Sequence, residues 1–483
     1  MSSYLIFLLL SATLGPLLFG YHLAELNAPQ NVMTCGTETL PLDTELGRAE
    51  RLPQCIDMNA WEFGLVSSFF TLGGLVGALA AGPVTAAKGR LRTMRYAAVA
   101  STVGAVFEAA AMYMALLTLG RFISGLGAGA FMVVVPIYIF ELAPPGKKGV
   151  FGMGTQIMAN LGILITQVLG LFWSTGRRWR VILAAGGVIA LVQALMLGLA
   201  GQESPQYLAD HGKPAEARMV LQKLRGHAAD IDAEVMGWAP NLEAEQEALL
   251  DMPPQHRAPA HDGAEKPTLG PLEVLRHPDT APAVFAVTMI MLAQQLTGIN
   301  SIVMYGVGLL SSQLGTHSAL LNAGVSALNL LVTTAAAPLP DRLGRKPCLL
   351  FSICGMGVSS LALALAIPHS LPALSAVAVL AFVASFALGL GPIPFMLASE
   401  LVAPDAVAAT QSIALATNWL ATFAVAQFFP VVNERLAPGR VYFLFCGAAA
   451  LFAALVWRCV PETKGKRTAE EVWGRTKAAR RAD

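Results

Sequence analysis

Charged residues are scarce in this chain. Asp, Glu, Lys and Arg make up 13% of its 483 residues, whereas a soluble domain carries about 25% to cover its wet surface. Hydrophobic residues make up 55%, and the mean hydropathy is +0.58. The net charge of only +1 gives no reason to expect a nucleic-acid partner. The composition argues against a soluble protein and indicates a chain that lies largely within a lipid bilayer.

Motifs for catalysis and for cofactors are also lacking. The eight histidines are scattered without the spacing of metal ligands. No Gly-rich phosphate-binding loop occurs, and no nucleophile stands in a recognisable catalytic cluster. We therefore expect a protein that is not an enzyme, that holds no metal or cofactor, and that does not use ATP directly.

Long apolar stretches dominate what is present. A helix that crosses a bilayer needs about 20 such residues. Twelve stretches qualify, near residues 4–24, 62–82, 94–115, 118–140, 150–172, 180–200, 281–311, 319–340, 348–367, 372–399, 408–430 and 440–460. The first has no basic segment before it and no small-residue cleavage site after it, so we interpret it as a membrane helix and not as a signal peptide. The fold class predicted is an all-α membrane protein with about 12 transmembrane helices.

One long hydrophilic segment divides these stretches into two sets of six. We predict a six-helix bundle over residues 1–200, a helical linker over 201–280, a second six-helix bundle over 281–460 and a tail over 461–483. Within the linker we expect amphipathic helices at 213–225 and 242–250 and a flexible connector at 251–267.

Lys and Arg are concentrated in the loops after the second and eighth stretches and in the tail. These regions share one side if twelve helices alternate, and the excess of positive charge predicts that this side is cytoplasmic. Both termini and the linker would then be cytoplasmic. Arg177, Arg178 and Arg180 depart from the rule, because they lie on the opposite side.

The first loop on the opposite side, residues 25–61, contains Cys35 and Cys55. An oxidising compartment would allow a disulfide between them. Two cysteines alone do not fix the geometry of a bridge, so the sequence leaves the bridged and the free states open.

Two charged motifs occur once in each half. Gly89, in a Gly-Arg-Leu-Arg loop, precedes Glu141 by 52 residues, and Gly344, in a Gly-Arg-Lys loop, precedes Glu400 by 56. Two unrelated motifs at matched spacing indicate two parallel repeats, related by an axis along the membrane normal.

These and further motifs resemble the sugar porter family of the major facilitator superfamily. The residues that carry the resemblance are Gly120-Arg121-Phe122, Pro136 to Glu141, Gln294 to Asn300, Asp341 to Lys346, Gly391 to Pro394 and Pro461 to Gly465. They extend over most of the chain, from about residue 19 to residue 466. The segment Phe19 to Gln30 is similar to the facilitative glucose transporters, and its Tyr21-His22-Leu23 core to a fungal vacuolar-sorting-type branch. The resemblance implies the major facilitator fold, with a hexose or related sugar bound between halves that open alternately to the two sides.

Carboxamide side chains inside apolar stretches are the candidate substrate ligands. Such a group is costly in hydrocarbon unless it is hydrogen-bonded, and its donors and acceptors complement a sugar hydroxyl. The alternative is hydrogen bonding between neighbouring helices. The resemblance assigns substrate binding to Gln156, Gln294, Gln295, Asn300, Asn329 and Asn418, with Phe395 and Trp419 as aromatic walls of the pocket.

The charged loop motifs are the second candidate site. In the family, the positions of Arg90, Glu141, Arg345 and Glu400 form a cytoplasmic gate between the halves. The alternative is that these arginines only set the topology. Ala86 stands where the family has Asp or Asn, which puts the gate of the first half in doubt.

His22 and Arg121 bear on energy coupling. Proton-coupled members of the family carry Asp at the position of His22, near the arginine that corresponds to Arg121. Without that Asp, we expect facilitative uniport, with His22 as a polar wall residue. The first alternative is a proton-coupled sugar or polyol transporter on an internal membrane, and the second is a non-transporting sugar sensor. The partners expected are a monosaccharide and the lipid bilayer of a plasma or internal membrane, with protons in the coupled alternative, and the chain is expected to be monomeric.

Overall fold

The structure, a computed structural model, describes residues 2–36, 52–144, 148–226, 231–236, 271–315, 317–466 and 469–474, and these contain helices but no strand. The first half consists of α1 (Ser3–Ala24), α2 (Gln30–Met33), α3 (Ala60–Lys88), α4 (Arg90–Ala109), α5 (Met114–Leu142), α6 (Lys148–Trp173) and α7 (Trp179–Ala200). The linker contains α8 (Pro205–Asp210), α9 (Pro214–Arg225), α10 (Asp232–Met236) and α12 (Pro271–Arg276). The predicted linker helix at 242–250 and the connector at 251–267 lie outside the described residues.

The second half consists of α13 (Ala281–Leu296), α14 (Ile299–Leu314), α15 (His317–Ala336), α16 (Leu339–Leu343), α17 (Arg345–Ala366), α18 (Pro372–Leu388), α19 (Ile393–Glu400), α20 (Pro404–Arg435) and α21 (Tyr442–Cys459). The short α22 (Ala469–Val472) lies in the tail. The all-α prediction is confirmed. We continue to propose residues 200, 280 and 460 as the limits of the two halves, the linker and the tail.

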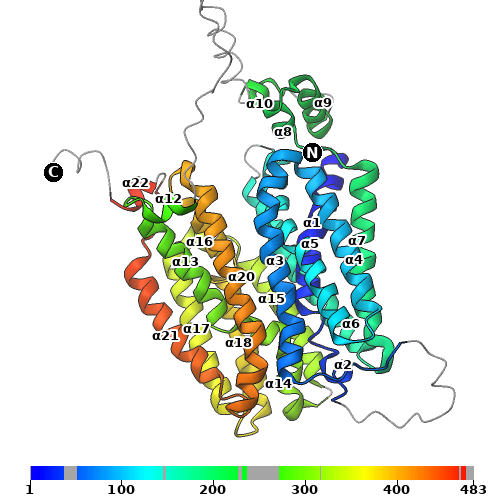
Figure 1. Ribbon diagram of the computed structural model, residues 1–483. Coiled ribbons are helices and arrows are strands. Elements are labelled where there is room, and N and C mark those ends of the chain that lie inside the picture. Colours follow the sequence, from blue (N-terminus) through cyan, green and yellow to red (C-terminus); the bar gives the residue numbers. More distant parts are fainter. Residues whose placement is uncertain are drawn as a thin grey trace, which may run out of the picture.

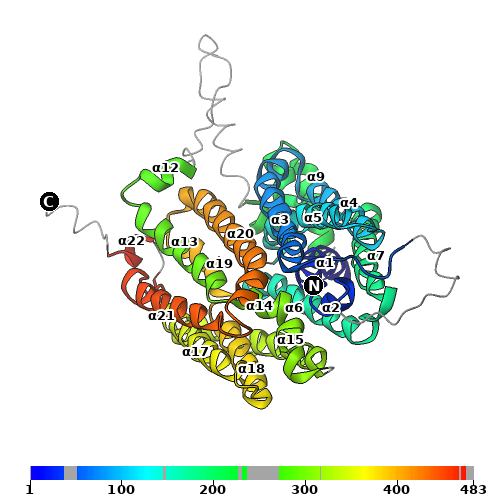
Figure 2. The same cartoon turned by 60° about the horizontal axis from the view of Figure 1, so that its bottom comes forward.

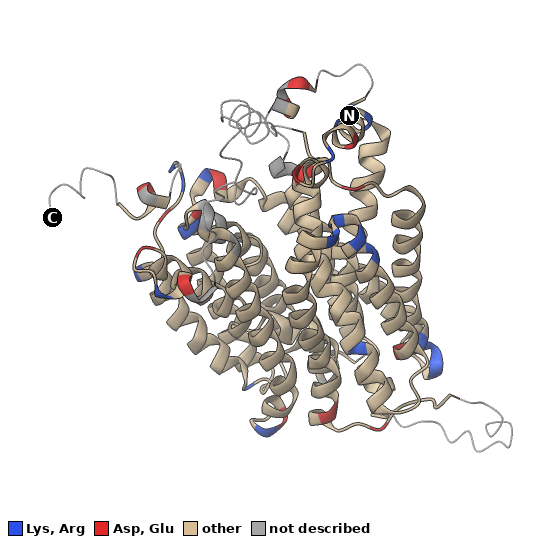
Figure 3. Cartoon of the chain, turned by 45° about the horizontal axis from the view of Figure 1, so that its top comes forward, with Lys and Arg blue, Asp and Glu red and all other residues tan. Residues whose placement is uncertain are grey.

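The two halves stand side by side with their helices roughly parallel (Figure 1). They meet where α3 packs on α20 and where α6 packs on α15 (Figure 2). The linker helices α8 to α10, the start of α1 and the tail helix α22 lie at one end of the bundles, which we call the linker side. The short α2 lies at the other end, which we call the disulfide side (Figure 1). Charged residues lie mainly toward these two ends (Figure 3).

Among the described residues, eleven helical stretches are long and apolar enough to cross a membrane. The predicted span at 94–115 corresponds to α4, which ends at Ala109 and lies beside α5 and α7. This helix is less apolar because it carries Arg90, Arg92 and Arg95 near one end and Glu108 near the other. With α4 added to these eleven stretches, the described residues contain about twelve helices that can span the membrane.

Two predicted spans are broken in the structure. The stretch 281–311 divides into α13 and α14 at Gly298, whose φ of 99° is in the left-handed region that favours glycine. The stretch 372–399 divides into α18 and α19 at Gly389 to Pro392, where Pro392 lacks a backbone N–H. Hydrophobicity averages over such breaks, so the two apolar stretches gave no sign of them, although both still qualify as membrane spans. Unwound backbone at membrane depth is tolerated where it lines a cavity.

Glycines bring α3 and α5 into close contact. A Cβ atom added to Gly125 would lie 2.1 Å from the carbonyl oxygen of Phe70, and one added to Gly129 would lie 2.0 Å from that of Gly74. No larger side chain fits without moving a helix. This close packing brings Arg121 of α5 next to the aromatic side chains of α3.

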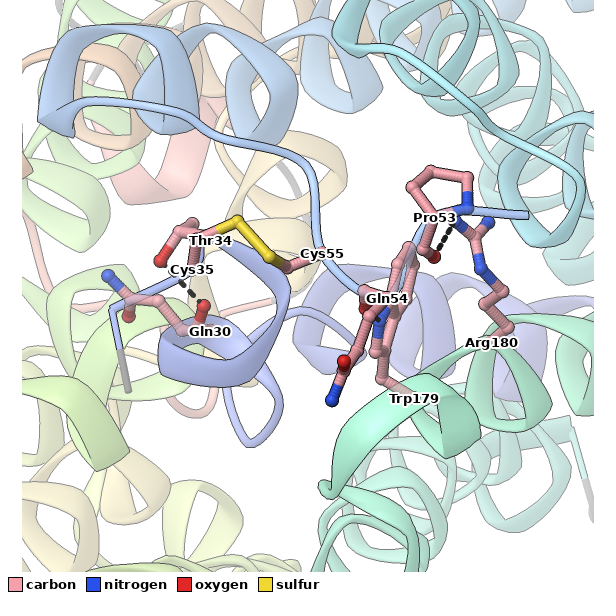
Figure 4. Close-up of a disulfide and its surroundings, with 8 residues drawn as sticks. All are labelled: Gln30, Thr34, Cys35, Pro53, Gln54, Cys55, Trp179 and Arg180. Carbon is pink, nitrogen blue, oxygen red and sulfur yellow. Dashed lines mark hydrogen bonds between the residues drawn. A yellow bond between two sulfur atoms is a disulfide. The ribbon is translucent and has the colours of Figure 1, made fainter. Parts of the chain in front are cut away.

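A disulfide joins Cys35 and Cys55, whose Cα atoms are 5.3 Å apart (Figure 4). Beside it, the Trp179 indole N–H donates to the carbonyl oxygen of Gln54 at 2.8 Å. Arg180 donates to the carbonyl oxygens of Pro53 at 3.0 Å and Ala111 at 2.6 Å. Arg180 therefore departs from the charge rule because its guanidinium ties the loop to the helix ends.

Candidate functional site

A cavity with an empty volume of about 750 Å³ lies between the two halves. All eight residues predicted to bind substrate line it: Gln156, Gln294, Gln295, Asn300, Asn329, Phe395, Asn418 and Trp419. The structure brings these residues together from six helices, while their role in binding stays a prediction.

Four of the carboxamides form one hydrogen-bonded group. Asn300 donates to the Gln295 side-chain oxygen at 2.6 Å, and Asn418 donates to that of Gln294 at 2.7 Å. Gln295 donates to Gln294 at 3.2 Å and to Asn418 at 3.3 Å. Their amides are thus pre-oriented, so a ligand does not pay to order each one separately.

The helix breaks hold this group in place. Gln294 lies in the last turn of α13, and its amide donates to the carbonyl oxygens of Leu390 at 2.7 Å and Gly391 at 3.1 Å. Both carbonyls belong to the unwound segment between α18 and α19, where no helical bond would use them. Asn300 follows the other break, at the second position of α14.

A second group of polar side chains connects the two halves. Gln156 donates to Asn160 at 3.2 Å, and Asn160 donates to the Thr333 hydroxyl at 3.0 Å. Asn329 donates back to Asn160 at 3.4 Å. Asn160 was missed in the sequence, although it lies four residues after Gln156 and therefore on the same face of α6.

Aromatic rings line another part of the cavity. Trp419 is 5% exposed and packs edge-on against Phe19, with ring centroids 5.7 Å apart. Gly74 lies under the indole, because a Cβ there would come within 2.3 Å of it. Phe386 and Phe395 also line the cavity. Phe19 and Phe386 were not singled out in the sequence, where an apolar residue in an apolar stretch carries no signal.

The cavity lining is polar but uncharged. Among the described residues, seven carboxamides and one threonine face it, and no Asp, Glu, Lys, Arg or His does. A ligand with a net charge would find no counter-ion in this low-dielectric setting, and a buried unpaired charge is very costly. The arrangement suits a neutral molecule with many hydroxyl groups and an apolar face.

The cavity is closed toward the disulfide side. The Asn27 amide donates to the Val303 carbonyl oxygen at 2.8 Å and accepts from the Val307 N–H at 2.9 Å, so that it bridges one turn in the interior of α14. Ser68 donates to Gln427 at 2.8 Å, from α3 to α20. These contacts join the two halves where the chain would have to part to open this side.

The predicted gate residues pair within each half. Arg90 donates to both oxygens of Glu141, the shortest bond being 2.6 Å, and Arg345 does the same with Glu400 at 2.9 Å. The resemblance implied a gate between the halves. In this state each pair instead ties two helices of one half, and a role in gating stays a prediction.

Two further carboxylates complete these clusters and were missed in the sequence. Glu203 accepts from the backbone N–H groups of Arg90 and Leu91 at 2.9 and 3.2 Å. Glu462 accepts from those of Arg345 and Lys346 at 2.9 and 3.0 Å. Each therefore caps the first turn of a helix, which is a favourable place for a negative charge.

The pKa values of the two capping carboxylates shift in opposite directions. Burial raises the pKa of Glu203 above its ordinary value, against the opposing effect of its backbone donors and Arg90. Burial would also raise the pKa of Glu462, but N–H donation from Lys464, Arg345, Lys346 and Thr463 outweighs it, and the pKa is lowered. Glu462 is therefore the more firmly ionised of the two.

His22 and Arg121 lie together, with carboxylates that the sequence analysis overlooked. Arg121 donates to the Glu25 carboxylate and, at 2.7 Å, to the His22 carbonyl oxygen. Glu108 of α4 faces the same point. The premise that no first-helix carboxylate accompanies Arg121 was wrong, because Glu25 follows His22 by one turn. The signal available was an ionisable residue inside an apolar stretch, which by default suggests function.

Residues 8–473 match the family described as sugar and other transporters. The chain belongs to this family. It is 36% identical over 469 residues to a probable metabolite transport protein of Saccharomyces cerevisiae, covering 96% of this chain and 93% of that one. It is 34% identical over 480 residues to facilitated glucose transporter protein 1 of Caenorhabditis elegans, covering 94% and 87%.

The fold is that of the major facilitator transporters. The structure is similar to the inward open conformation of the xylose transporter XylE from E. coli, with a TM-score of 0.75, 23% identity, and coverage of 97% of this chain and 99% of that one. The predicted fold and family are thereby confirmed, and the protein is a multi-pass membrane carrier.

Proposed function

We propose that this protein carries a neutral monosaccharide, a hexose or a closely related sugar, across a membrane by alternating access. The observation that supports the proposal most directly is the cavity between the halves, with seven carboxamides, a tryptophan and no charge among its described lining residues. Carboxamides can bond the hydroxyl groups of a sugar, and the indole can cover its C–H face. The glucose transporter among the relatives supports the same substrate class.

Transport requires that the sugar also leave. A millimolar dissociation constant corresponds to about −4 kcal/mol, and a few net hydrogen bonds of about 1 kcal/mol each with one stacking contact supply this. The contacts at Asn27 and Ser68 close the disulfide side. Opening that side would break them while the halves rock about the cavity.

The linker side is proposed to face the cytoplasm, since Lys and Arg are concentrated there. The membrane is proposed to be the plasma membrane or an internal one. A relative named vacuolar protein sorting-associated protein 73, 32% identical over 467 residues, supports the internal choice. The proposed working unit is the monomer, with the sugar and the bilayer as its partners.

Transport of radiolabelled hexose by the purified protein in liposomes tests the proposal. Gln294→Ala and Asn300→Ala should each weaken sugar binding by about 1–2 kcal/mol, or roughly 5- to 30-fold, because each removes a hydrogen bond. Gln193→Ala is the matched control. Gln193 is a buried carboxamide of α7 that donates to the Ser11 carbonyl oxygen at 3.1 Å and lies outside the cavity.

Charged sugars sharpen the test. Glucosamine and glucuronate have the size of glucose, but each places a charge in a lining without counter-ions, so neither should compete with glucose. Unchanged sugar binding in both cavity variants, or equal binding of the charged sugars, would contradict the proposed site.

A further inference from the structure

Four ionisable side chains are sealed inside the first half, apart from the cavity. They are His22 and Glu25 at the end of α1, Glu108 of α4 and Arg121 of α5, and none is more than 1% exposed. The ligand atoms of His22, Glu25 and Glu108 all lie within 4.8 Å of one another. We call these four residues the charged cluster, and Glu25 with Glu108 the carboxyl pair.

The charges of the cluster do not balance if both carboxyls are ionised. Arg121 carries one positive charge at any ordinary pH. Two carboxylates would leave a net charge of −1 in a site shielded from bulk solvent, with two like charges close together. One proton on the carboxyl pair brings the total to zero.

The hydrogen bonds indicate where this proton lies. Glu25 accepts from Arg121 and lies 3.0 Å from Nδ1 of His22. Both oxygens of Glu108 are buried and have no hydrogen-bond partner among the described residues. A proton on Glu108 would turn it into a donor toward Glu25. A second proton on His22 instead would lie on Nε2, which has no hydrogen-bond partner among the described residues.

A metal ion would fit the charges less well. His22, Glu25 and Glu108 are possible ligands of a divalent cation. With two carboxylates and Arg121, however, such an ion would leave a net charge of +1 in the sealed site and would lie against a guanidinium. A proton leaves no net charge.

The other polar groups around the cluster are already engaged. Tyr21 of α1 donates to the Ile182 carbonyl oxygen at 2.6 Å, and Tyr305 of α14 donates to the Ala426 carbonyl oxygen. Arg180 of α7 is bonded to backbone carbonyls. On the α3 side, the ring of Phe70 covers the guanidinium of Arg121 at 4.6 Å. None of these groups supplies a second positive charge to the carboxyl pair.

The cluster is mechanically connected to both the cavity and the closed side. Phe70, which covers Arg121, also packs against Phe19 and Trp419 of the cavity, with ring centroids 6.5 Å apart in each case. Glu25 is two residues before Asn27, which bonds to the backbone of α14 across the interface between the halves. A movement of this end of α1 would therefore change the carboxyl pair and the closure together.

We propose that Glu25 and Glu108 form a proton-binding site, which holds one shared proton while the disulfide side is closed and releases it when that side opens to water. Opening hydrates the pair, so that both carboxylates can ionise beside Arg121. Sugar exchange through the disulfide side then depends on the pH of that compartment. This consequence for transport rests on the proposed function, whereas the proton site itself does not.

Infrared difference spectroscopy of the purified full chain tests the site without any sugar. The wild-type protein should show the C=O band of one buried protonated carboxyl at neutral pH. Glu25→Gln and Glu108→Gln should each lose that band, because one carboxylate then balances Arg121 without a proton. Glu108→Asp, which keeps the carboxyl, should retain it. An unchanged band in both Gln variants would overturn the proposal.

Sugar exchange in liposomes, measured over a range of pH on the disulfide side, gives the second readout. The wild-type rate should vary with pH, and the two Gln variants should lose this variation while still binding sugar from the linker side. His22→Asn should retain it, because its amide can still donate to Glu25. Loss of pH dependence in His22→Asn but not in Glu108→Gln would place the proton on the imidazole and refute the carboxyl pair.

The two proposals can fail separately. If the wild-type protein shows the carboxyl band but moves no sugar, the proposed function fails and the proton site stands. If the wild-type protein transports sugar at a rate that does not vary with pH, the proposed link between the carboxyl pair and transport is refuted, while the proposed sugar site stands. If Glu108→Gln does not fold, Glu25→Gln provides the same test, because it also leaves one carboxylate to balance the charge of Arg121.

Discussion

The linker-side ends of the two halves carry corresponding arginine–glutamate groups, and the two groups differ in their surroundings. In each, an arginine at the start of a helix binds a glutamate from a second helix, and another glutamate caps the arginine's own helix. Arg90, Glu141 and Glu203 form the cluster of the first half. Arg345, Glu400 and Glu462 form that of the second.

The difference lies in what surrounds the arginine. Arg345 also pairs with Asp341 at 3.0 Å, four residues before it. The corresponding position before Arg90 is Ala86, and the guanidinium of Arg90 instead lies over the ring of Tyr207, 4.9 Å from its centroid. The first half therefore holds its arginine with one carboxylate and one aromatic face.

The largest effect is expected when each arginine is removed. Arg345→Ala should lower the free energy of unfolding by about 3 kcal/mol, since it leaves Glu400 partly buried without its partner. Arg90→Ala should cost at least as much, about 3–4 kcal/mol, because the Glu141 side chain that it strands is more buried, 10% exposed against 26% for Glu400. Unfolding of the purified variants in detergent measures both. A much smaller loss for Arg90→Ala would contradict the difference in burial between the two glutamates.

The capping glutamates should respond to acid in opposite directions. The lowered pKa of Glu462 means that its contribution to stability is present above the ordinary glutamate pKa of 4.5 and is lost as the pH falls further. The raised pKa of Glu203 means that its contribution is complete below 4.5 and is lost as the pH rises through the raised value.

Glu462→Gln should therefore reduce the melting temperature more than Glu203→Gln at neutral pH, and the gap should narrow near pH 4.5. Melting curves of the two variants beside the wild-type protein provide the measurement. If the difference in melting temperature between the two variants widens on acidification, the opposite pKa shifts of Glu203 and Glu462 are contradicted.

The sequence predicted the fold and the cavity well because both leave periodic or repeated signals. Apolar length marks a membrane helix, and a carboxamide such as Gln294 or Asn418 stands out in hydrocarbon. Asn160 was missed because its neighbour Gln156 was considered alone. The breaks at Gly298 and at Gly389 to Pro392 were missed because an average over an apolar stretch hides both a single left-handed glycine and a short unwound segment.

The carboxylates were missed for a different reason. Glu25 and Glu108 are 83 residues apart, and only the packing of α1, α4 and α5 brings them to Arg121. The family motif also places its carboxylate at position 22, where this chain has His22, whereas Glu25 supplies a carboxylate one helical turn later. Comparison with a family motif shows that the carboxylate is absent at position 22, but it does not show that Glu25 supplies one three residues later.

The smallest effect, and the most specific to the comparison, is expected from Ala86→Asp. Ala86 is exposed and lies four residues before Arg90, as Asp341 lies four residues before Arg345. A glycine directly precedes each arginine, and the φ values of Gly89 and Gly344 are similar, 92° and 104°. An aspartate at position 86 should therefore reach the guanidinium of Arg90. Because the pair would be largely exposed, like Asp341 with its side chain 70% exposed, the gain should be at most about 0.5–1 kcal/mol. Ala86→Asn, which has nearly the same shape without the charge, is the matched control, and high salt should remove the gain. If Asn stabilises as much as Asp, or if the gain survives high salt, the missing carboxylate is not what distinguishes the two halves.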